Sequence, residues 1–320
     1  MFASPFLRKT KKIICFGGGN AMPATVLRGL KEKDAEITAV CSVLDSGGSS
    51  GRLRKEYGII SPGDLRRAFL ELSDFSFEDK KLLNYRFGEG ELKGHNLGNM
   101  VFLALCLNKD NYHEVFEKLN KLLDEKYKIL PSTIHPSELV AVLENGEEIV
   151  GETKIDIPQH NTGLKIKKVF LRPVVGACPQ TIRRIKKADM VIIGPGDIFS
   201  SLMQIFLVEG ISGAIKNSKA KRVYIANLMT KDGESNGFSV EDFAAEMEKY
   251  LQCPLDCVIF NNKNPGEERV KKYKEKHKEL LGLSLCSSSL PKFLGRDIIK
   301  EEGDVVHDPQ KLANVIFNLM

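Results

Sequence analysis

The stretch ITAVCSVLDSGGSSGR, residues 37–52, decides the fold of this chain. Its first half, Ile37–Leu44, is an apolar run of the length expected for a buried strand. Its second half, Asp45–Arg52, contains three glycines, which allow the backbone to turn N–H groups toward one point, and three serines, which add hydroxyl donors. Solvated connections often have such a composition, but they rarely open with a carboxylate and close on arginines, as this one does at Arg52 and Arg54. We therefore predict a phosphate-binding loop directly after a buried strand, with contacts from Asp45, Ser46, Gly47, Gly48, Ser49, Ser50 and Arg52.

Four more apolar runs resemble the first, and most are followed by a turn and a helical pattern. They are Ile13–Phe16, Met190–Ile193, Val223–Ala226 and Val258–Phe260. This alternation predicts an α/β, Rossmann-like fold with a mainly parallel sheet and helices on both faces. Ligands of such sheets bind outside the carboxyl ends of the strands. The segments expected to line one cleft there are Gly17–Asn20, Asp45–Gly51, Gly194–Asp197, Asn227–Thr230 and Asn261–Asn262.

The middle of the chain has a different pattern. Leu139–Leu143, a turn at Asn145-Gly146 and Ile149–Lys154 predict a hairpin, to which Lys165–Leu171 adds a strand. Prolines punctuate both flanks of this region. We expect a single nucleotide-binding domain, residues 1–320, with a β-rich insertion or subdomain at about 131–178. Pro309–Met320 predicts a short amphipathic helix at the C-terminus.

The composition argues against several classes of protein. Hydrophobic residues make up 42% of the 320 and charged residues 28%, as in an ordinary globular chain. No apolar stretch approaches the roughly 20 residues of a membrane span, and Met1–Lys12 lacks the apolar region of a secretion signal. The basic run Lys271–Lys278 is typical of a solvated helix face, and no nucleic-acid-binding module is recognisable. The seven cysteines lack the spacing of metal ligands and suit a reducing compartment. We expect a cytoplasmic protein without a nucleic-acid partner, a membrane span or a structural metal.

Two glycine-rich turns are candidates for phosphate binding. Gly17, Gly18, Gly19 and Asn20 lie between the first predicted strand and a helix expected near Ala24, the placement of a mononucleotide-binding turn. The dinucleotide pattern G-x-G-x-x-G would need a third glycine where Met22 stands, which disfavours an NAD-dependent enzyme. The same order of strand, turn and helix recurs later in the chain, at Gly194, Pro195, Gly196, Asp197 and Ser200. Two facing turns of this kind favour a pyrophosphate ligand.

Two acidic residues have more than one interpretation. Asp45 could hold a ribose hydroxyl or could ligate Mg²⁺ between phosphates. Ser61-Pro62-Gly63-Asp64 predicts a helix start with Ser61 as N-cap, Pro62 at the first helical position and Asp64 complementing the helix dipole. Arg66 would then either pair with Asp64 or contact a phosphate.

A further polar segment precedes the apolar helix predicted at Met100–Leu107. It places His95, Asn96 and Asn99 at a helix N-terminus. His95 as a general base is the minority interpretation, because the sequence supplies no carboxylate to orient it. A capping or core histidine is the alternative.

Taken together, these motifs resemble the gluconeogenesis-factor family, which is related to the CofD-type 2-phospho-L-lactate transferases. The resemblance spans nearly the whole chain. Its blocks are the triglycine turn, Asp45–Gly58, Pro62–Arg66, Gly94–Asn99, Pro131–Thr133, Gly151-Glu152, Gly194–Gly196, Asn227–Thr230, Gly233-Glu234 and His307–Pro309. Four positions depart from the family pattern: Asn20-Ala21 replaces Thr-Gly, Ser46 replaces a second aspartate, Asp197 replaces serine, and Val306 replaces an arginine before His307.

The resemblance implies a nucleotide at the carboxyl edge of a Rossmann-like sheet. In the gluconeogenesis-factor branch this is a UDP-sugar, and in the CofD branch it is GDP together with a deazaflavin. Asn227, Met229, Thr230 and Tyr273 resemble the first branch, in which that tyrosine is associated with the nucleotide sugar. Members of this branch act in carbon metabolism, envelope synthesis and cell shape.

Two functions follow as hypotheses. The first is a UDP-sugar-binding regulatory protein that needs no cofactor and no catalytic base. The alternative is a phospho-group transferase that uses a GDP-activated 2-phospholactate-type donor with Mg²⁺ near Asp45, and for it Asp45, Asp64 and His95 are the catalytic candidates. Ser46 disfavours the transferase, because it removes a second carboxylate for the metal. A homo-oligomer is compatible with both hypotheses.

Overall fold

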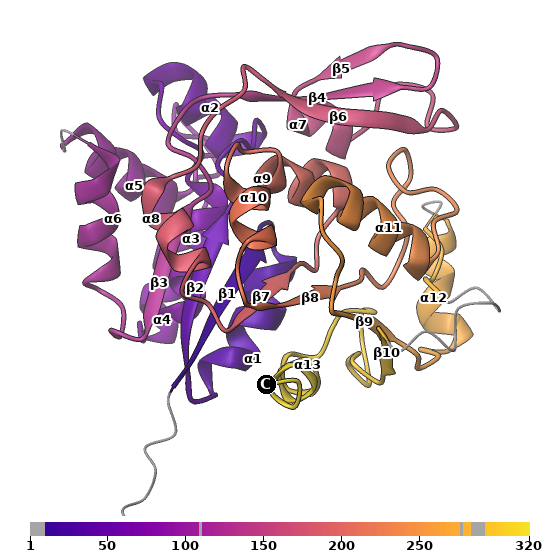
Figure 1. Cartoon of the computed structure of the whole chain (residues 1–320). Helices are drawn as coiled ribbons and strands as arrows, with labels where there is room; N and C mark the ends of the chain where they lie inside the picture. The colour runs from indigo at the N-terminus through magenta and orange to yellow at the C-terminus, as the bar shows by residue number, and fades with distance from the viewer. Residues whose placement is uncertain (1–9, 109–110, 276–277, 283–291) are drawn as a thin grey trace, which may run out of the picture.

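The computed structural model describes residues 10–108, 111–275, 278–282 and 292–320. Its centre is a seven-stranded sheet of order β10-β9-β8-β7-β1-β2-β3, in which all neighbouring strands are parallel (Figure 1). The strands are β1 (Lys11–Gly17), β2 (Ala35–Cys41), β3 (Tyr127–Pro131), β7 (Met190–Ile193), β8 (Lys221–Ile225), β9 (Cys257–Asn261) and β10 (Phe293–Arg296). The predicted α/β fold with a mainly parallel sheet is confirmed.

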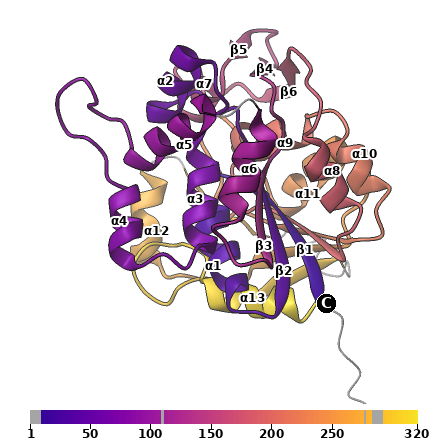
Figure 2. The ribbon, with the colours of Figure 1, turned by 90° about the vertical axis from the view of Figure 1, so that its left-hand side faces the viewer.

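Helices cover both faces of this sheet. On one face lie η1 (Pro23–Leu27, π-helical), α1 (Arg28–Lys31), α3 (Gly63–Leu72) and α13 (Pro309–Phe317). On the other lie α8 (Pro179–Ile185), η2 (Ile198–Met203, π-helical), α9 (Gln204–Phe206), α10 (Ile211–Lys216) and α11 (Val240–Leu251). Figure 2 shows these two layers on opposite sides of the strands. Because both faces are covered, the central strands are continuous apolar runs, such as β7, in which all four residues are buried.

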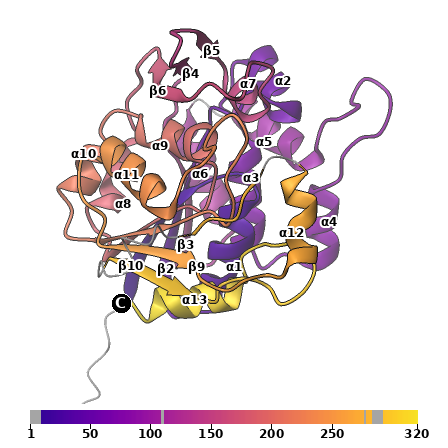
Figure 3. The same ribbon diagram turned by 90° about the vertical axis from the view of Figure 1, so that its right-hand side faces the viewer.

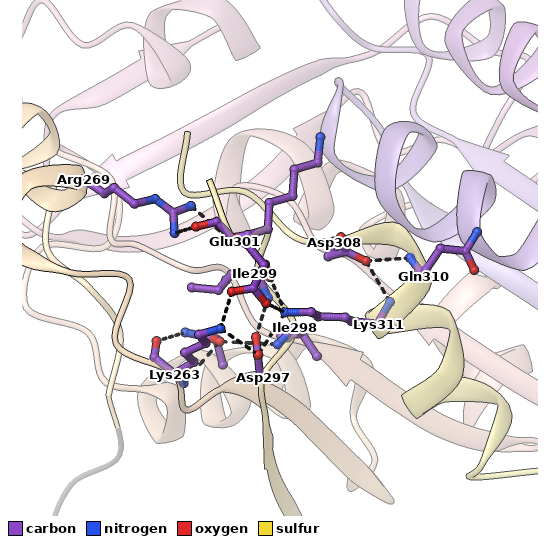
Figure 4. A network of polar contacts seen from close by, with 11 residues as sticks. Lys263, Arg269, Asp297, Ile298, Ile299, Glu301, Asp308, Gln310 and Lys311 are labelled. Atoms are coloured by element: carbon purple, nitrogen blue, oxygen red, sulfur yellow. Dashed lines mark hydrogen bonds and ion pairs between the residues drawn. The ribbon is translucent and has the colours of Figure 1, made fainter. Parts of the chain in front are cut away.

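The remaining helices surround this three-layer core. They are α2 (Gly48–Tyr57), α4 (Phe77–Leu83), α5 (Leu97–Leu107), α6 (Tyr112–Asn120) and α12 (Glu267–Lys274). The C-terminal part of the chain is joined by a polar network in which Lys263 and Lys311 both bind Asp297 and Glu301 (Figure 4). This network links the ends of β9 and β10 to α13.

A three-stranded antiparallel sheet lies above the carboxyl ends of the large sheet (Figures 1 and 3). It consists of β4 (Glu138–Leu143), β5 (Glu148–Val150) and β6 (Ile166–Arg172), in the order β5-β4-β6. The predicted strand Ile149–Lys154 is wrong beyond Val150. Gly151 has φ +104°, and the chain turns there into the short helix α7 (Glu152–Asp156).

Other local predictions need correction. The strand predicted at Ile37–Leu44 ends at Cys41, and the helix after the first glycine turn begins before Ala24. Ser61 does not cap α3, because the helix begins at Gly63 with Pro62 as its N-cap and the Ser61 hydroxyl has no partner among the described residues. The predicted helical run at Lys271–Lys278 ends at Lys274 as α12, and residues 276–277, like residues 1–9, lie outside the described part of the chain. Within the described ranges, no helix has the length and apolarity that crossing a membrane requires.

Candidate functional site

The strand order reverses between β1 and β7. The chain proceeds from β1 to β2 and β3 on one side, and from β7 to β8, β9 and β10 on the other. Such a reversal opens a crevice at the carboxyl ends of the two central strands, where ligands of α/β sheets bind. The two predicted glycine turns, Gly17–Asn20 and Gly194–Asp197, lie at these two strand ends. The Gly194 N–H donates to the Phe16 carbonyl at 2.8 Å, which holds the turns side by side.

The first turn is shaped by Asp64 of α3. A Cβ atom at Gly18 would lie 2.0 Å from the Asp64 carboxylate, so only glycine fits there without displacing that side chain. The N–H of Gly19 is a hydrogen-bond donor to Asp64, and Gly19 itself has φ +60° with open space around it. Asn20, the last residue of the turn, is exposed. The turn is therefore held from below by a buried carboxylate and is open above.

The second turn is fixed by an amide from the next strand. Asn227, two residues beyond the end of β8, accepts a hydrogen bond from the Gly196 N–H at 2.9 Å. Gly194 and Pro195 are buried, and Gly194 needs its positive φ of +79°. Ser200, in the first turn of η2, is fully buried and donates to Glu234 at 2.6 Å.

The loop after β2 is shorter than the sequence predicts. Asp45 accepts the Gly47 N–H at 2.8 Å, and α2 begins at Gly48. Ser49 and Ser50 therefore lie on a helix and are buried. Arg52 is exposed and donates to the Lys93 carbonyl at 2.7 Å.

A buried polar network joins α2, α3 and α5. The Ser49 hydroxyl lies 3.2 Å from Nδ1 of His95 and 3.2 Å from Nδ2 of Asn99, and it accepts the Asn96 N–H at 3.2 Å. Asn99 in turn accepts a hydrogen bond from Nε of Arg66 at 3.0 Å. Burial and the nearby Arg52 lower the pKa of His95, which keeps its ring neutral at pH 7. These side chains position the start of α2 relative to α3 and α5.

A chain of carboxylates crosses the carboxyl edge. Burial, followed by the charges of Asp45 and Asp156, raises the pKa of Glu152 on α7 to about 8. Burial raises the pKa of Asp64 to about 6, with Arg67 acting in the opposite direction and Asp45 adding to the increase. Bound Mg²⁺ would relieve the repulsion among such groups, so they are candidates to hold it next to a phosphate.

Glu152 and Thr153 of α7 bind the loop after β2 at Ser46. Its Oε2 accepts the N–H of Ser46 at 3.3 Å, and Oγ1 of Thr153 lies 3.0 Å from the Ser46 hydroxyl. Ser46 is the position at which the resembling family has a second aspartate. A carboxyl group from α7, more than a hundred residues further along the chain, thus meets the loop at this position.

A second acidic group surrounds Lys231. The Lys231 ammonium binds Asp156, Asp197 at 2.8 Å and Glu234 at 2.9 Å. Burial alone would lower the pKa of Lys231, but Glu234 and Asp197 raise it, so the ammonium stays charged. The oxygens of the three carboxylates lie within 4.8 Å of one another, a spacing that could hold a metal ion, and the lysine provides a cation among them.

The helix α7 connects the two halves of the carboxyl edge. At its first residues Glu152 and Thr153 bind Ser46 in the loop after β2, and at its last residue Asp156 binds Lys231 in the loop after β8. Figure 1 shows α7 below the small sheet, above the carboxyl ends of the central strands. The β-rich segment therefore contributes side chains to the candidate site.

The comparisons with known proteins agree with this architecture. Residues 13–298 match the model of the family described as 2-phospho-L-lactate transferase CofD. The chain is 39% identical over 312 residues to the "Putative gluconeogenesis factor" of Thermotoga maritima, which covers 95% of this chain and 98% of that protein. It is 35% identical to the "Gluconeogenesis factor" of Bacillus subtilis, over 97% of this chain and 98% of the relative. This chain belongs to the CofD family, among the gluconeogenesis factors.

The fold is shared with a solved member of the family. A crystal structure of a UPF0052 family protein from Bacillus halodurans superimposes with a TM-score of 0.90, at 32% identity, over 97% of this chain and 99% of that one. The CofD-family assignment made from the sequence motifs is confirmed.

A third group of predicted residues lies further along the edge of this CofD-family sheet. Thr230 accepts the N–H of Glu279 at 2.9 Å, Met229 pairs with Leu280, and the Tyr273 hydroxyl accepts the N–H of Val305 at 3.2 Å. A hollow of about 620 Å³ next to Thr230 is lined only by polar residues and glycines, among them Asp232, Asn236 and Lys278. Tyr273 packs with Leu228, Ile299 and Val305 and does not line this hollow.

The sequence analysis missed several residues at the site. Glu152 and Glu234 come from segments taken as a strand or as family blocks without assigned roles, and Asp156 and Lys231 come from positions with no assigned motif. His307 is another: it is buried, burial lowers its pKa to about 4, and its Nε2 has no partner among the described residues. Its neighbour Val306 is exposed where the family pattern has an arginine. The glycine at 151 is the one local signal that the strand ends before Glu152.

Proposed function

We propose that this protein binds a UDP-sugar at the carboxyl edge of its sheet and acts as a regulatory protein of the gluconeogenesis-factor type in the cytoplasm. The observation that carries the proposal is the pair of glycine turns, Gly17–Asn20 and Gly194–Asp197, held together at the reversal of strand order. Their place at the reversal of strand order suits the two phosphates of a nucleotide diphosphate. The N–H groups of Gly19, Gly194 and Gly196 bind Asp64, Phe16 and Asn227, so the phosphate contacts come from the other groups of the turns. The family membership supports a role in carbon metabolism, and envelope synthesis and cell shape belong to the same proposal.

In this proposal the sugar occupies the polar hollow beside Thr230. That hollow offers a hydroxyl, carboxylates, an amide and an ammonium, which are the groups that bind sugar hydroxyls. At about 620 Å³ its volume lies within the common range for small-ligand sites. Asn227 and Met229 lie on the segment between the diphosphate turns and this hollow, and Tyr273 supports the segment from behind.

A thermal-unfolding experiment tests the proposal. UDP-N-acetylglucosamine or UDP-glucose in about 100-fold excess over its dissociation constant adds about 2.7 kcal/mol to the unfolding free energy and raises the melting temperature, whereas NAD at the same concentration does not. If neither UDP-sugar changes the melting temperature, the proposal fails.

One observation favours phospho-group transfer as a second candidate. Glu152 and Asp64 flank Asp45 at the edge, so the absence of a carboxylate at Ser46 no longer argues against a Mg²⁺ site. When bound, Mg²⁺ would neutralise the charge on the leaving phosphate. In that reaction the Asp64 carboxylate, with a pKa of about 6, could take the proton of the acceptor hydroxyl. The release of GMP from a GDP-activated 2-phospholactate donor, lost in Asp64→Asn, is the assay for this candidate.

A further inference from the structure

Two adjoining hollows lie away from the candidate site, on the side of the large sheet where its strands begin. The first has a volume of about 620 Å³, lies between α6 and α8, and has six basic side chains in its lining: Lys12, Lys121, Lys128, Arg183, Arg184 and Lys187. The second, about 590 Å³, lies between α8 and α10 and adds Lys186 and Lys219. Lys187 lines both, so the two hollows form one continuous surface, which we call the basic strip. Figure 2 faces this side of the molecule.

The basic strip concentrates the positive charge of the chain. Its lining includes eight basic side chains and two acidic ones, Glu117 and Glu125. The strip therefore has an excess of six positive charges, whereas the net charge of the whole chain is +5. Glu36 at the rim approaches Lys12 at 3.8 Å and Arg184 at 3.9 Å, which are distances of loose ion pairs. Burial, followed by the charge of Arg184, lowers the pKa of Lys128, with Glu125 and Asp124 acting in the opposite direction.

The helix dipole does not account for this arrangement. Arg183 and Arg184 lie in the last turn of α8, where positive charge is favourable. Lys12 and Lys128, however, lie on strands β1 and β3, and Lys121 and Lys219 lie beyond the ends of α6 and α10. Basic side chains from five separate elements converge on one surface.

The shape and lining of the strip indicate which kind of anionic partner it binds. Two joined hollows fit an extended ligand better than a compact one. None of the residues that line them is aromatic, so the strip lacks the platforms on which nucleic-acid bases stack. Strand addition at β3 is blocked, because the Asn120 amide binds both the N–H and the carbonyl of Ile129, at 2.7 and 3.0 Å. A partner must therefore be held by its side chains.

We propose that the basic strip is the docking surface for an acidic segment of a protein partner, whose Asp and Glu side chains pair with Arg183, Arg184 and the surrounding lysines. The guanidinium groups bind carboxylates in a two-pronged geometry, and the lysines add non-directional attraction. This surface is separate from the nucleotide site, so the partner and the nucleotide bind at the same time.

The test uses a fluorescein-labelled peptide of twenty glutamates and the full-length protein, with fluorescence anisotropy as the readout. The variant Lys121→Glu/Arg183→Glu/Lys187→Glu reverses three exposed charges of the strip. The control Lys81→Glu/Lys167→Glu/Lys271→Glu makes the same change in net charge at exposed positions elsewhere. Circular dichroism shows whether each variant is folded, and Arg183→Gln/Lys187→Gln serves as the milder strip variant.

We expect the wild-type protein to bind the peptide, the strip variant to lose at least about tenfold in affinity, and the control to stay within about twofold. Binding should weaken as salt is added, because the contacts are exposed. Equal losses in the strip variant and the control would overturn the proposal, and so would no binding by the wild-type protein. A twenty-nucleotide oligothymidylate that binds more tightly than the peptide would also overturn it and would assign the strip to nucleic acid.

Discussion

At the scale of single residues, Gly18 is the position of the site where an added side chain has least room. A methyl group there would displace the Asp64 carboxylate, which is 2.0 Å from the place of the new Cβ, and would remove its hydrogen bond with Gly19. We expect Gly18→Ala to weaken nucleotide binding at least about tenfold and to cost about 1–3 kcal/mol of stability. Gly213→Ala is the control, because nothing lies within 4 Å of its Cβ position. Calorimetry and urea unfolding measure the two effects, and equal behaviour of the two variants would contradict the account.

Glu152 makes stability depend on pH. Its pKa of about 8 in the folded chain lies above the ordinary value of 4.5, so the folded state binds the proton more tightly than the unfolded state does. The contribution of this group to stability is therefore greatest below about pH 4.5. It falls as the pH rises toward 8, by at most about 1.4 kcal/mol per pH unit. Asp64 contributes in the same direction between its ordinary pKa of 3.8 and about 6.

Glu152→Gln should remove most of this dependence. Urea unfolding at pH 5, 6.5 and 8, values chosen to cover roughly the range of that titration, should give a flatter profile for the variant than for the wild-type protein. The exposed Glu89→Gln is the matched control and should keep the wild-type slope. Parallel profiles for wild type and Glu152→Gln would show that the carboxyl group is not held in its protonated form.

The residues of the site could be predicted only in part from the sequence. Gly17–Asn20 and Gly194–Asp197 were recognisable because a strand precedes each turn and a helix follows it. Glu152 was not, because its partner Ser46 is more than a hundred residues away and no local pattern connects the two. Ser49 and Asn99 were recognised as polar residues near a loop, and the structure shows that they bind each other.

At the scale of secondary-structure elements, α7 depends on Lys231 for its position. Lys231 is the cation among Asp156, Asp197 and the fully buried Glu234. Lys231→Met leaves these carboxylates without their partner and should lower the unfolding free energy by about 3 kcal/mol. This is the lower end of the range for a broken buried pair, because Asp156 and Asp197 are partly exposed. Excess Mg²⁺ should restore part of the loss in the variant, since the three carboxylates are close enough to bind a metal.

Lys263→Met is the matched control for this prediction. Lys263 also lies between two carboxylates, Asp297 and Glu301, but on the surface (Figure 4). Exposed ion pairs contribute little, so its loss should change stability less and should show no rescue by Mg²⁺. Urea unfolding with and without Mg²⁺ compares the two variants. Equal losses would mean that Lys231 is no more than a surface partner of α7.

The elements that the sequence predicted best are the buried strands. Met190–Ile193 is apolar throughout and is β7 at those bounds. β3 and β10 were missed, because Lys128 and Pro131 interrupt the apolar pattern of one and Gly295 that of the other. Both are edge strands, which need less continuous apolar sequence. Gly295 is required there for packing, since its Cβ would lie 2.7 Å from the ring of Phe260.

At the scale of the whole molecule, the candidate nucleotide site and the basic strip lie on different parts of the large sheet. The carboxyl edge holds the carboxylates of Asp45, Asp64 and Glu152, and the basic strip lies beside the amino half. If the nucleotide binds at the carboxyl edge alone, hydrogen exchange should slow only there. A bound UDP-sugar should protect residues 17–24, 194–200 and 227–230, and leave residues 183–187 unchanged, as mass spectrometry of the digested protein would detect. Protection confined to residues 183–187 would place the nucleotide on the basic strip instead.

The measurement that tests the central claim most directly is calorimetric titration of the purified protein with UDP-N-acetylglucosamine, UDP-glucose, GDP and NAD, each with and without Mg²⁺. The account predicts one-site binding of a UDP-sugar, weakened by Gly18→Ala and independent of the charge-reversed strip variant. A preference for GDP that requires Mg²⁺ would contradict it in favour of phospho-group transfer. The absence of heat with all four ligands would mean that the two glycine turns do not hold a nucleotide diphosphate.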